Sequence, residues 1–142
     1  MTKPATASST AAPLHLRIGE LARLSGRSVH TIRWYEAQSL MPGAARDGGG
    51  RRLFSQAHVD WLELMTRLRA SGMSIRQMQA YARQVRAGKG TLGARQALLR
   101  EHRARVEQQV DDLQQALALI DRKVALYDKW IRKHGPGDAA DL

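Results

Sequence analysis

The sequence of 142 residues contains no cysteine. Disulfide bonds, thiolate metal ligands and thiol redox switches are therefore excluded for this chain. Any signal that the protein senses must act through other chemistry. The absence of cysteine does not by itself identify the compartment in which the protein works.

The chain also lacks a continuous apolar segment near its start. Residues 1–13 (MTKPATASSTAAP) are small, polar and proline-containing, and they show neither a signal peptide nor a membrane anchor. Such a segment cannot bury enough apolar surface to offset the entropy of ordering it, so we expect a disordered tail. The cytoplasm is the default expectation for the protein's location.

Acidic residues are scarce relative to basic ones. Lys and Arg number 23 against 13 Asp and Glu, which gives a formal net charge of +10. Residues 14–90 carry thirteen of the basic side chains but only five of the acidic ones. A surplus of this size favours a polyanionic partner, with nucleic acid ahead of an anionic membrane, and it places the anion-binding half at the front of the chain.

Apolar spacing predicts a mostly α-helical chain. Two short helical segments flank Gly26, and Ala22, Val29 and Ile32 lie where a helix-turn-helix needs a small residue and two inward-facing branched ones. A plain two-helix hairpin would produce the same spacings. The run 41–43 (Met-Pro-Gly) is expected to end the second helix.

A glycine cluster at residues 48–50 lies among arginines, as expected at the tip of a short hairpin, and we interpret this hairpin as a wing. Ser55 is expected to cap a helix that Gly72 ends, and Ser74 to cap a second one. Residues 14–88 therefore predict one winged helix-turn-helix domain that includes a helix pair.

The longest helical pattern covers residues 91–133, where apolar residues alternate at spacings of four and three, as in heptads. The front domain is too small to cover such a helix, so its apolar stripe needs a partner, most simply a second copy. The fold that we expect is an antiparallel coiled coil in a homodimer. Residues 134–142 are expected to form a flexible tail. The residues predicted at the dimer seam are Leu99, Val106, Val110, Leu113, Leu117, Ile120, Val124, Tyr127 and Ile131.

One series of residues runs through the front of the chain at recognisable spacings: Ile18-Gly19-Glu20-Leu21-Ala22, Gly26, Thr31-Ile32-Arg33-Trp34-Tyr35-Glu36, Leu40, Arg46, Gly50, Arg52-Leu53-Phe54-Ser55 and Gly72. In order and spacing this series resembles the amino-terminal domain of the MerR family of transcriptional regulators. The resemblance implies a homodimer that binds a palindromic element in double-stranded promoter DNA. It also implies that the protein distorts this DNA so that RNA polymerase engages both promoter boxes.

The resemblance places the second helix in the major groove, with His30, Thr31 and Arg33 on its outward face. Arg33 is the best candidate reader, because a guanidinium donates two parallel hydrogen bonds to guanine. Trp34 and Tyr35 occupy paired aromatic positions, where one ring packs inward and the other lies against the DNA backbone. The remaining candidates for DNA contact are the helix cap Ser28, the wing residues Arg46, Arg51 and Arg52, and Ser74 with Arg76 at the start of a later helix.

Two departures from the family pattern lie in the wing. Arg51 and Phe54 stand where relatives commonly have tyrosines, so two phenolic hydroxyls that could bond phosphate are absent. Glu36 is expected to orient a basic side chain. The latter part of the chain looks closest to a short branch linked to aldehyde and electrophile stress, but it lacks that branch's cysteine near Arg67.

No cofactor or metal is expected. The five histidines lie too far apart in sequence to suggest a shared metal site. A stripe of methionine and aromatic side chains, formed by Trp61, Met65, Met78 and Tyr81, is compatible with core packing or with a small ligand pocket.

Three classes of function are to be distinguished. An enzyme is disfavoured, because the chain shows no paired nucleophile and base, and its glycine cluster lacks the ending of a phosphate-binding loop. A non-specific architectural DNA-binding protein remains the alternative to a sequence-specific regulator. A coiled-coil scaffold that does not bind DNA is a third interpretation. The operator, the inducer and the direction of regulation stay open.

Overall fold

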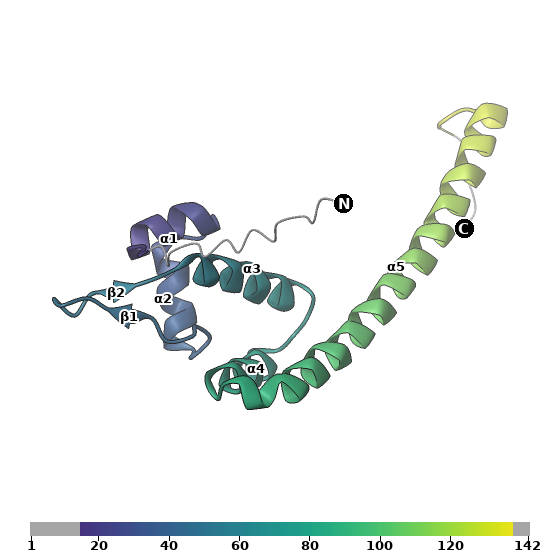
Figure 1. The fold of residues 1–142 in the computed structure, drawn as a ribbon. Coiled ribbons are helices and arrows are strands. Elements are labelled where there is room, and N and C mark those ends of the chain that lie inside the picture. The colour runs from purple at the N-terminus through teal and green to yellow at the C-terminus, as the bar shows by residue number, and fades with distance from the viewer. Residues whose placement is uncertain (1–14, 138–142) are drawn as a thin grey trace, which may run out of the picture. The chain divides into compact units, whose positions relative to one another are not determined.

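The computed structural model describes residues 15–137 and is mostly helical (Figure 1). One compact unit extends to Leu98 and a second begins at Leu99, inside the last helix. The predicted tail over residues 1–13 lies outside the described residues, as does the end of the tail predicted over 134–142. The elements are α1 (Ile18–Ser25), α2 (Val29–Ala37), β1 (Ala45–Arg46), β2 (Arg52–Leu53), α3 (Gln56–Ala70), α4 (Ile75–Arg86), the 3-10 turn η1 (Lys89–Thr91) and α5 (Leu92–His134).

The helix-turn-helix forms as predicted. Gly26 ends α1 with a φ of 68°, a left-handed conformation that glycine adopts without steric cost. Ser28 caps α2 by accepting a hydrogen bond from the Thr31 amide over 3.0 Å. Leu21 of α1 and Ile32 of α2 are completely buried, so the two helices meet through their apolar faces.

The predicted end of α2 is wrong. The helix stops at Ala37, and Ser39 has a φ of 59°. The Leu40 amide then donates to the Tyr35 carbonyl over 2.9 Å and closes the turn. Leu40, which the apolar spacing places in the helix, is buried outside it, and so is Met41.

The wing is an antiparallel hairpin in which Ala45 pairs with Leu53 and Arg46 with Arg52. An isolated bridge between Leu16 and Phe54 extends the pairing beyond the hairpin, with hydrogen bonds of 2.7 and 2.8 Å in the two directions. The base of the wing is therefore held by the segment that precedes α1.

Two capping boxes start the helix pair. In the first, the Ser55 amide donates to Nδ1 of His58 over 3.0 Å; in the second, the Ser74 amide donates to Oε1 of Gln77 over the same distance. Gly72, with a φ of 98°, lies between the two helices. The predicted caps Ser55 and Ser74 are thus confirmed.

The core is formed by buried side chains of the helix-turn-helix, α3 and α4. Trp61, Met65, Met78 and Tyr81 are all buried there, and the rings of Trp61 and Tyr81 stack with centroids 5.6 Å apart. Of the two interpretations open for these four side chains, the structure supports core packing.

Hydrogen bonds from Arg95 connect the start of α5 to the end of α4. The Arg95 guanidinium donates to the carbonyls of Val85 and Gly88, over 3.2 and 2.7 Å, and to the Thr91 hydroxyl over 3.0 Å. Gly88 has a φ of 95°, which turns the chain out of α4. The carbonyls of Val85 and Gly88, at and just after the end of α4, therefore accept hydrogen bonds from a side chain of α5.

The long helix α5 has 43 residues, a length of about 65 Å at the standard rise. Leu99 and Val106 are half-buried, whereas the later seam residues from Val110 to Ile131 have exposed fractions between 42% and 66%. Gly135, with a φ of 84°, follows the helix. Within residues 15–137, no helix is both long and apolar enough to cross a bilayer.

Candidate nucleic-acid interface

The outward face of α2 presents His30 and Arg33 to solvent, while Ile32 and Tyr35 on the opposite face are buried. The Arg33 guanidinium forms no hydrogen bond or ion pair with any residue between 15 and 137. All of its donors are therefore available to a partner. Thr31 is partly engaged, because its hydroxyl accepts a hydrogen bond of 2.9 Å from the Ser28 hydroxyl.

The two adjacent aromatic residues of α2 divide as the sequence predicted, one inward and one outward. Tyr35 is 3% exposed, whereas Trp34 is half-buried and meets the Tyr35 ring edge to face at 5.3 Å. The Arg69 guanidinium lies 4.4 Å from the centre of a Trp34 ring, which is cation–π geometry. An open hollow of about 240 Å³ is lined by His30, Thr31, Trp34 and Arg69.

Arg69 was not among the residues singled out from the sequence. It comes near the end of α3, 35 positions after Trp34, so only the packing of α3 against the helix-turn-helix brings the two together. A basic residue on an exposed helix face gives no local signal of such a contact. Arg69 nonetheless adds a positive charge beside the outward face of α2.

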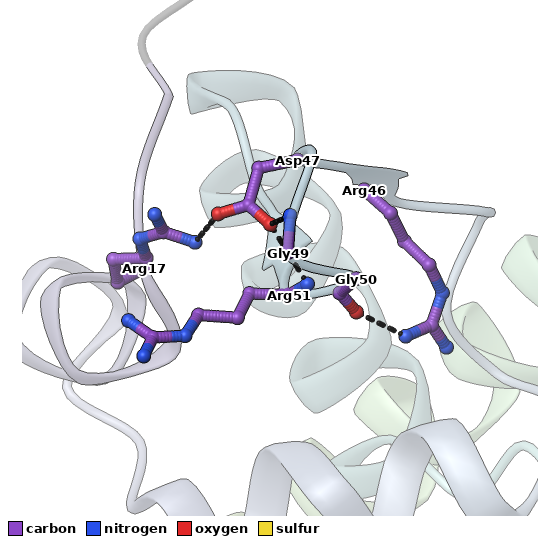
Figure 2. Close-up of polar contacts among 6 residues, drawn as sticks. All are labelled: Arg17, Arg46, Asp47, Gly49, Gly50 and Arg51. Atoms are coloured by element: carbon purple, nitrogen blue, oxygen red, sulfur yellow. Dashed lines mark hydrogen bonds and ion pairs between the residues drawn. The ribbon is translucent and has the colours of Figure 1, made fainter.

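The wing tip is organised by Asp47. Its Oδ1 accepts hydrogen bonds from the amides of Gly49 and Arg51, each over 2.9 Å, and its Oδ2 pairs with Arg17 at 2.6 Å (Figure 2). The Arg51 amide and the Arg17 guanidinium hold the pKa of the Asp47 carboxyl below its usual value. The loop is therefore shaped by a carboxylate that already has its partners.

Arg46 and Arg51 differ in what they bind. Arg46 donates from Nη1 to the Gly50 carbonyl over 2.7 Å, whereas the Arg51 side chain has no polar partner in the described part of the chain. Figure 2 shows the two side chains extending to opposite sides of the tip. Arg51 is thus the freer of the two for an external anion.

Arg52 is paired with a carboxylate of the same chain. Its Nη1 lies 2.8 Å from Oε1 of Glu36, whose side chain is only 14% exposed. This ion pair ties strand β2 of the wing to α2. Glu36 therefore orients a basic side chain of the wing and forms no ion pair with Arg33.

His58 supports the base of the wing from the start of α3. Its ring meets Phe54 edge to face at 5.3 Å, and its Nδ1 accepts from the Ser55 amide. Burial lowers the pKa of His58, while the Pro42 carbonyl and the charge of Glu36 oppose the shift. The neutral ring is the form that can accept the capping hydrogen bond.

The last predicted contacts lie at the start of α4. The Ser74 hydroxyl accepts from the Gln77 amide over 3.1 Å, and the exposed Arg76 guanidinium has no polar partner among residues 15–137. Ser74 therefore caps its helix, and Arg76 remains free.

These features together define a winged helix-turn-helix unit that carries an arginine-rich surface and is followed by a long helix with an exposed apolar stripe. Residues 16–85 match the family model described as MerR HTH family regulatory protein, and residues 59–123 match the model described as MerR, DNA binding. An uncharacterized HTH-type transcriptional regulator of Haemophilus influenzae is 32% identical over 104 residues, which cover 73% of this chain and 77% of that protein.

Two solved structures of MerR family regulators are similar to this chain. A putative MerR family transcriptional regulator from Listeria monocytogenes is 35% identical, with a TM-score of 0.74 and coverage of 80% of this chain and 86% of that one. HiNmlR, a MerR family regulator lacking the sensor domain and solved bound to promoter DNA, is 29% identical, also with a TM-score of 0.74, and the match covers 86% of this chain and 96% of that one. The chain belongs to the MerR family of DNA-binding transcriptional regulators, and it is not an enzyme.

Proposed function

We propose that two copies of the chain bind a palindromic element in double-stranded promoter DNA and alter transcription by distorting it. In this proposal α2 enters the major groove and the wing lies along the phosphate backbone. Arg33 reads a base edge, and His30 contacts a base or a phosphate.

The observation that carries this proposal is the free Arg33 guanidinium on the exposed face of a capped α2, beside a wing with a second free guanidinium on Arg51. Ser28 and the first amides of α2 present a positive helix end, which suits a phosphate. Arg46, Arg69 and Arg76 add further positive charges to the same unit, Arg69 lies over the ring of Trp34, and Arg52 contributes by holding the wing to α2.

The exposed stripe of α5 supports the homodimer. The seven seam residues from Val110 to Ile131 are each at least 42% exposed, and a monomer would leave this apolar face in water. A second copy of the same helix, running antiparallel, carries a matching stripe. A symmetric dimer in turn suits a palindromic site.

Distortion of the promoter is the proposed route to regulation. Two units joined by α5 would contact two half-sites at a fixed separation, so that binding selects DNA that deforms easily. RNA polymerase would then engage the deformed promoter. The structural neighbour HiNmlR was solved with promoter DNA, and this supports promoter DNA as the partner of the present protein.

The test is selection of bound duplexes from a random library, followed by footprinting of the protein on the enriched sequence and on the DNA upstream of its own coding region. We expect an inverted repeat to be enriched and both half-sites to be protected. When the site is moved along DNA fragments of equal length, the gel mobility of the complexes should depend on the position of the site, because the bound DNA is bent.

The same experiment separates the alternative. A non-specific architectural DNA-binding protein would bind with a steep salt dependence but enrich no sequence. That outcome would overturn the proposal that the protein is a sequence-specific regulator. A protein that bound no DNA at all would leave only a coiled-coil scaffold.

A further inference from the structure

The segment between α2 and the wing, residues 38–41, is held by side chains from α3 and α4. After α2 ends at Ala37, the chain makes a turn without regular hydrogen bonding of its own carbonyls. Each of the four carbonyls from Gln38 to Met41 instead accepts a hydrogen bond from a side chain that comes from farther along the sequence.

The donors come from three residues. Trp61 of α3 donates from Nε1 to the Leu40 carbonyl over 2.6 Å. Gln79 of α4 donates from Nε2 to the Gln38 carbonyl over 2.9 Å. Arg86, the last residue of α4, donates from both terminal nitrogens to the Ser39 carbonyl over 3.0 Å and from Nη1 to the Met41 carbonyl over 3.4 Å.

This segment matters because both DNA-facing elements depend on it. It follows α2 directly and leads within a few residues to β1, so its conformation sets the distance and angle between α2 and the wing. Ser39 lies in the left-handed region, with a φ of 59°, in the turn that the Leu40 amide closes on the Tyr35 carbonyl; this conformation is uncommon for a residue other than glycine. The Arg86 guanidinium binds the carbonyl of Ser39.

We propose that Gln79 and Arg86 are positioning residues for DNA recognition. They hold residues 38–41 so that α2 and the wing meet the groove and the backbone in register, although neither residue needs to touch DNA. The proposal rests on the proposed function, because it assumes that α2 and the wing are the elements that contact DNA.

The test uses substitutions that keep the charge. Arg86→Lys keeps the positive charge but removes the planar pair of donors, and Gln79→Met keeps the length of the side chain but removes its donor. Arg83→Lys is the matched control, since Arg83 is exposed one turn earlier on α4 and its side chain has no polar partner among residues 15–137. Each full-length variant is titrated with a duplex selected by the wild-type protein and with a scrambled duplex of the same composition, over a range of KCl concentrations.

We expect Arg86→Lys and Gln79→Met each to lower the ratio of the two affinities about tenfold, since a misplaced reading helix loses base contacts before it loses phosphate contacts. The salt dependence on scrambled DNA should stay that of the wild-type protein, and Arg83→Lys should leave both measurements unchanged. Arg86 is exposed, and lysine keeps the positive charge and most of the aliphatic stem, so Arg86→Lys should remain folded by circular dichroism.

Two results would overturn the proposal. A purely structural role would lower the active fraction equally for both duplexes, and the ratio would then not move in either variant. A direct phosphate contact would appear in Arg86→Met as a slope of log affinity against log salt that is smaller by about one. Failure of the proposed function gives a different result: the wild-type protein would enrich no duplex. The inference about Gln79 and Arg86 would then also be wrong.

Discussion

The arginines around α2 and the wing are chemically alike in the sequence but not in the structure. Arg17 and Arg52 are bound by the carboxylates of Asp47 and Glu36. Arg33 and Arg51 have no polar side-chain partner within residues 15–137. A guanidinium that already has a carboxylate partner gains less from a phosphate, so we expect the free arginines to carry most of the DNA contacts.

At the scale of single residues, Arg33 is expected to determine base specificity. Arg33→Ala should weaken binding to the selected duplex by about 1–3 kcal/mol and relax the preference at one position in each half-site. Fluorescence anisotropy on duplexes substituted at each position measures this. The control is Arg67→Ala, because Arg67 is exposed on α3 and paired with Glu63. Equal weakening on selected and scrambled DNA would instead make Arg33 a phosphate contact.

His58 predicts a dependence of stability on pH. Because burial lowers its pKa from 6.5 in the folded protein, the unfolded chain takes up the proton more readily. The free energy of unfolding should therefore be fully retained above about pH 6.5 and fall as the pH decreases towards the folded pKa. Urea unfolding near pH 7.5 and pH 5.5, values on either side of about 6.5, measures the difference.

The matched variant for this prediction is His58→Gln. Glutamine supplies the capping oxygen without titrating in this range, as Gln77 does in the second capping box of the same chain. The variant should lose less stability on acidification than the wild-type protein. His102, whose pKa is also lowered by burial, contributes with the same sign in both proteins. Equal losses in the two proteins would remove His58 as a source of the pH dependence.

At the scale of elements, the wing is held at three places. Its tip is shaped by Asp47, its base by the bridge between Leu16 and Phe54, and its side by the ion pair between Arg52 and Glu36. Phe54 is 2% exposed, so this position serves the core and presents no group to DNA. Of the wing arginines, Arg51 is the one whose side chain has no polar partner within residues 15–137, so we expect it to contact the backbone.

Arg51→Gln is therefore expected to weaken binding to selected and scrambled duplexes alike. The slope of log affinity against log salt should decrease by about one for each phosphate that the variant no longer binds. Titrations between low and moderate KCl concentration give this slope. Arg67→Gln, which removes one charge from α3, is the control. A change confined to the selected duplex would mean that Arg51 reads a base and not a phosphate.

The elements were predicted to different degrees. Gly26, Ser28, Ser55, Ser74 and the glycines at the wing tip are local signals, and the helices and the hairpin lie where these residues place them. The end of α2 was missed, because Leu40 is buried outside the helix although the apolar spacing makes it the last residue of the helical series. Apolar spacing reports which side chains are buried and not where the backbone changes conformation.

At the scale of the whole molecule, the apolar stripe of α5 is expected to join two chains. Leu117 lies on the predicted seam and is 58% exposed; Leu119, two residues later, is 57% exposed and points about 200° around the helix. The same substitution at these two positions therefore distinguishes the seam from the rest of the helix.

Leu117→Glu should weaken dimerisation on the order of a hundredfold or more, because two carboxylates would be buried in an apolar seam. Leu119→Glu should leave the dimer intact. Sedimentation equilibrium measures the association constant, and circular dichroism checks that helix content is retained. If both variants behaved alike, the seam inferred from the heptads would be wrong.

The family, the succession of helices and hairpin, and the basic character of the front unit all follow from the order of the amino acids, because turns, caps and periodic apolar positions act over a few residues. Which arginines are free follows only from the packing of the elements. For three of the engaged arginines the partner lies far along the chain: Asp47 is 30 positions from Arg17, Glu36 is 16 from Arg52, and Ser39 is 47 from Arg86. Contacts over such separations depend on how the elements meet in space, and no local pattern of residues encodes them.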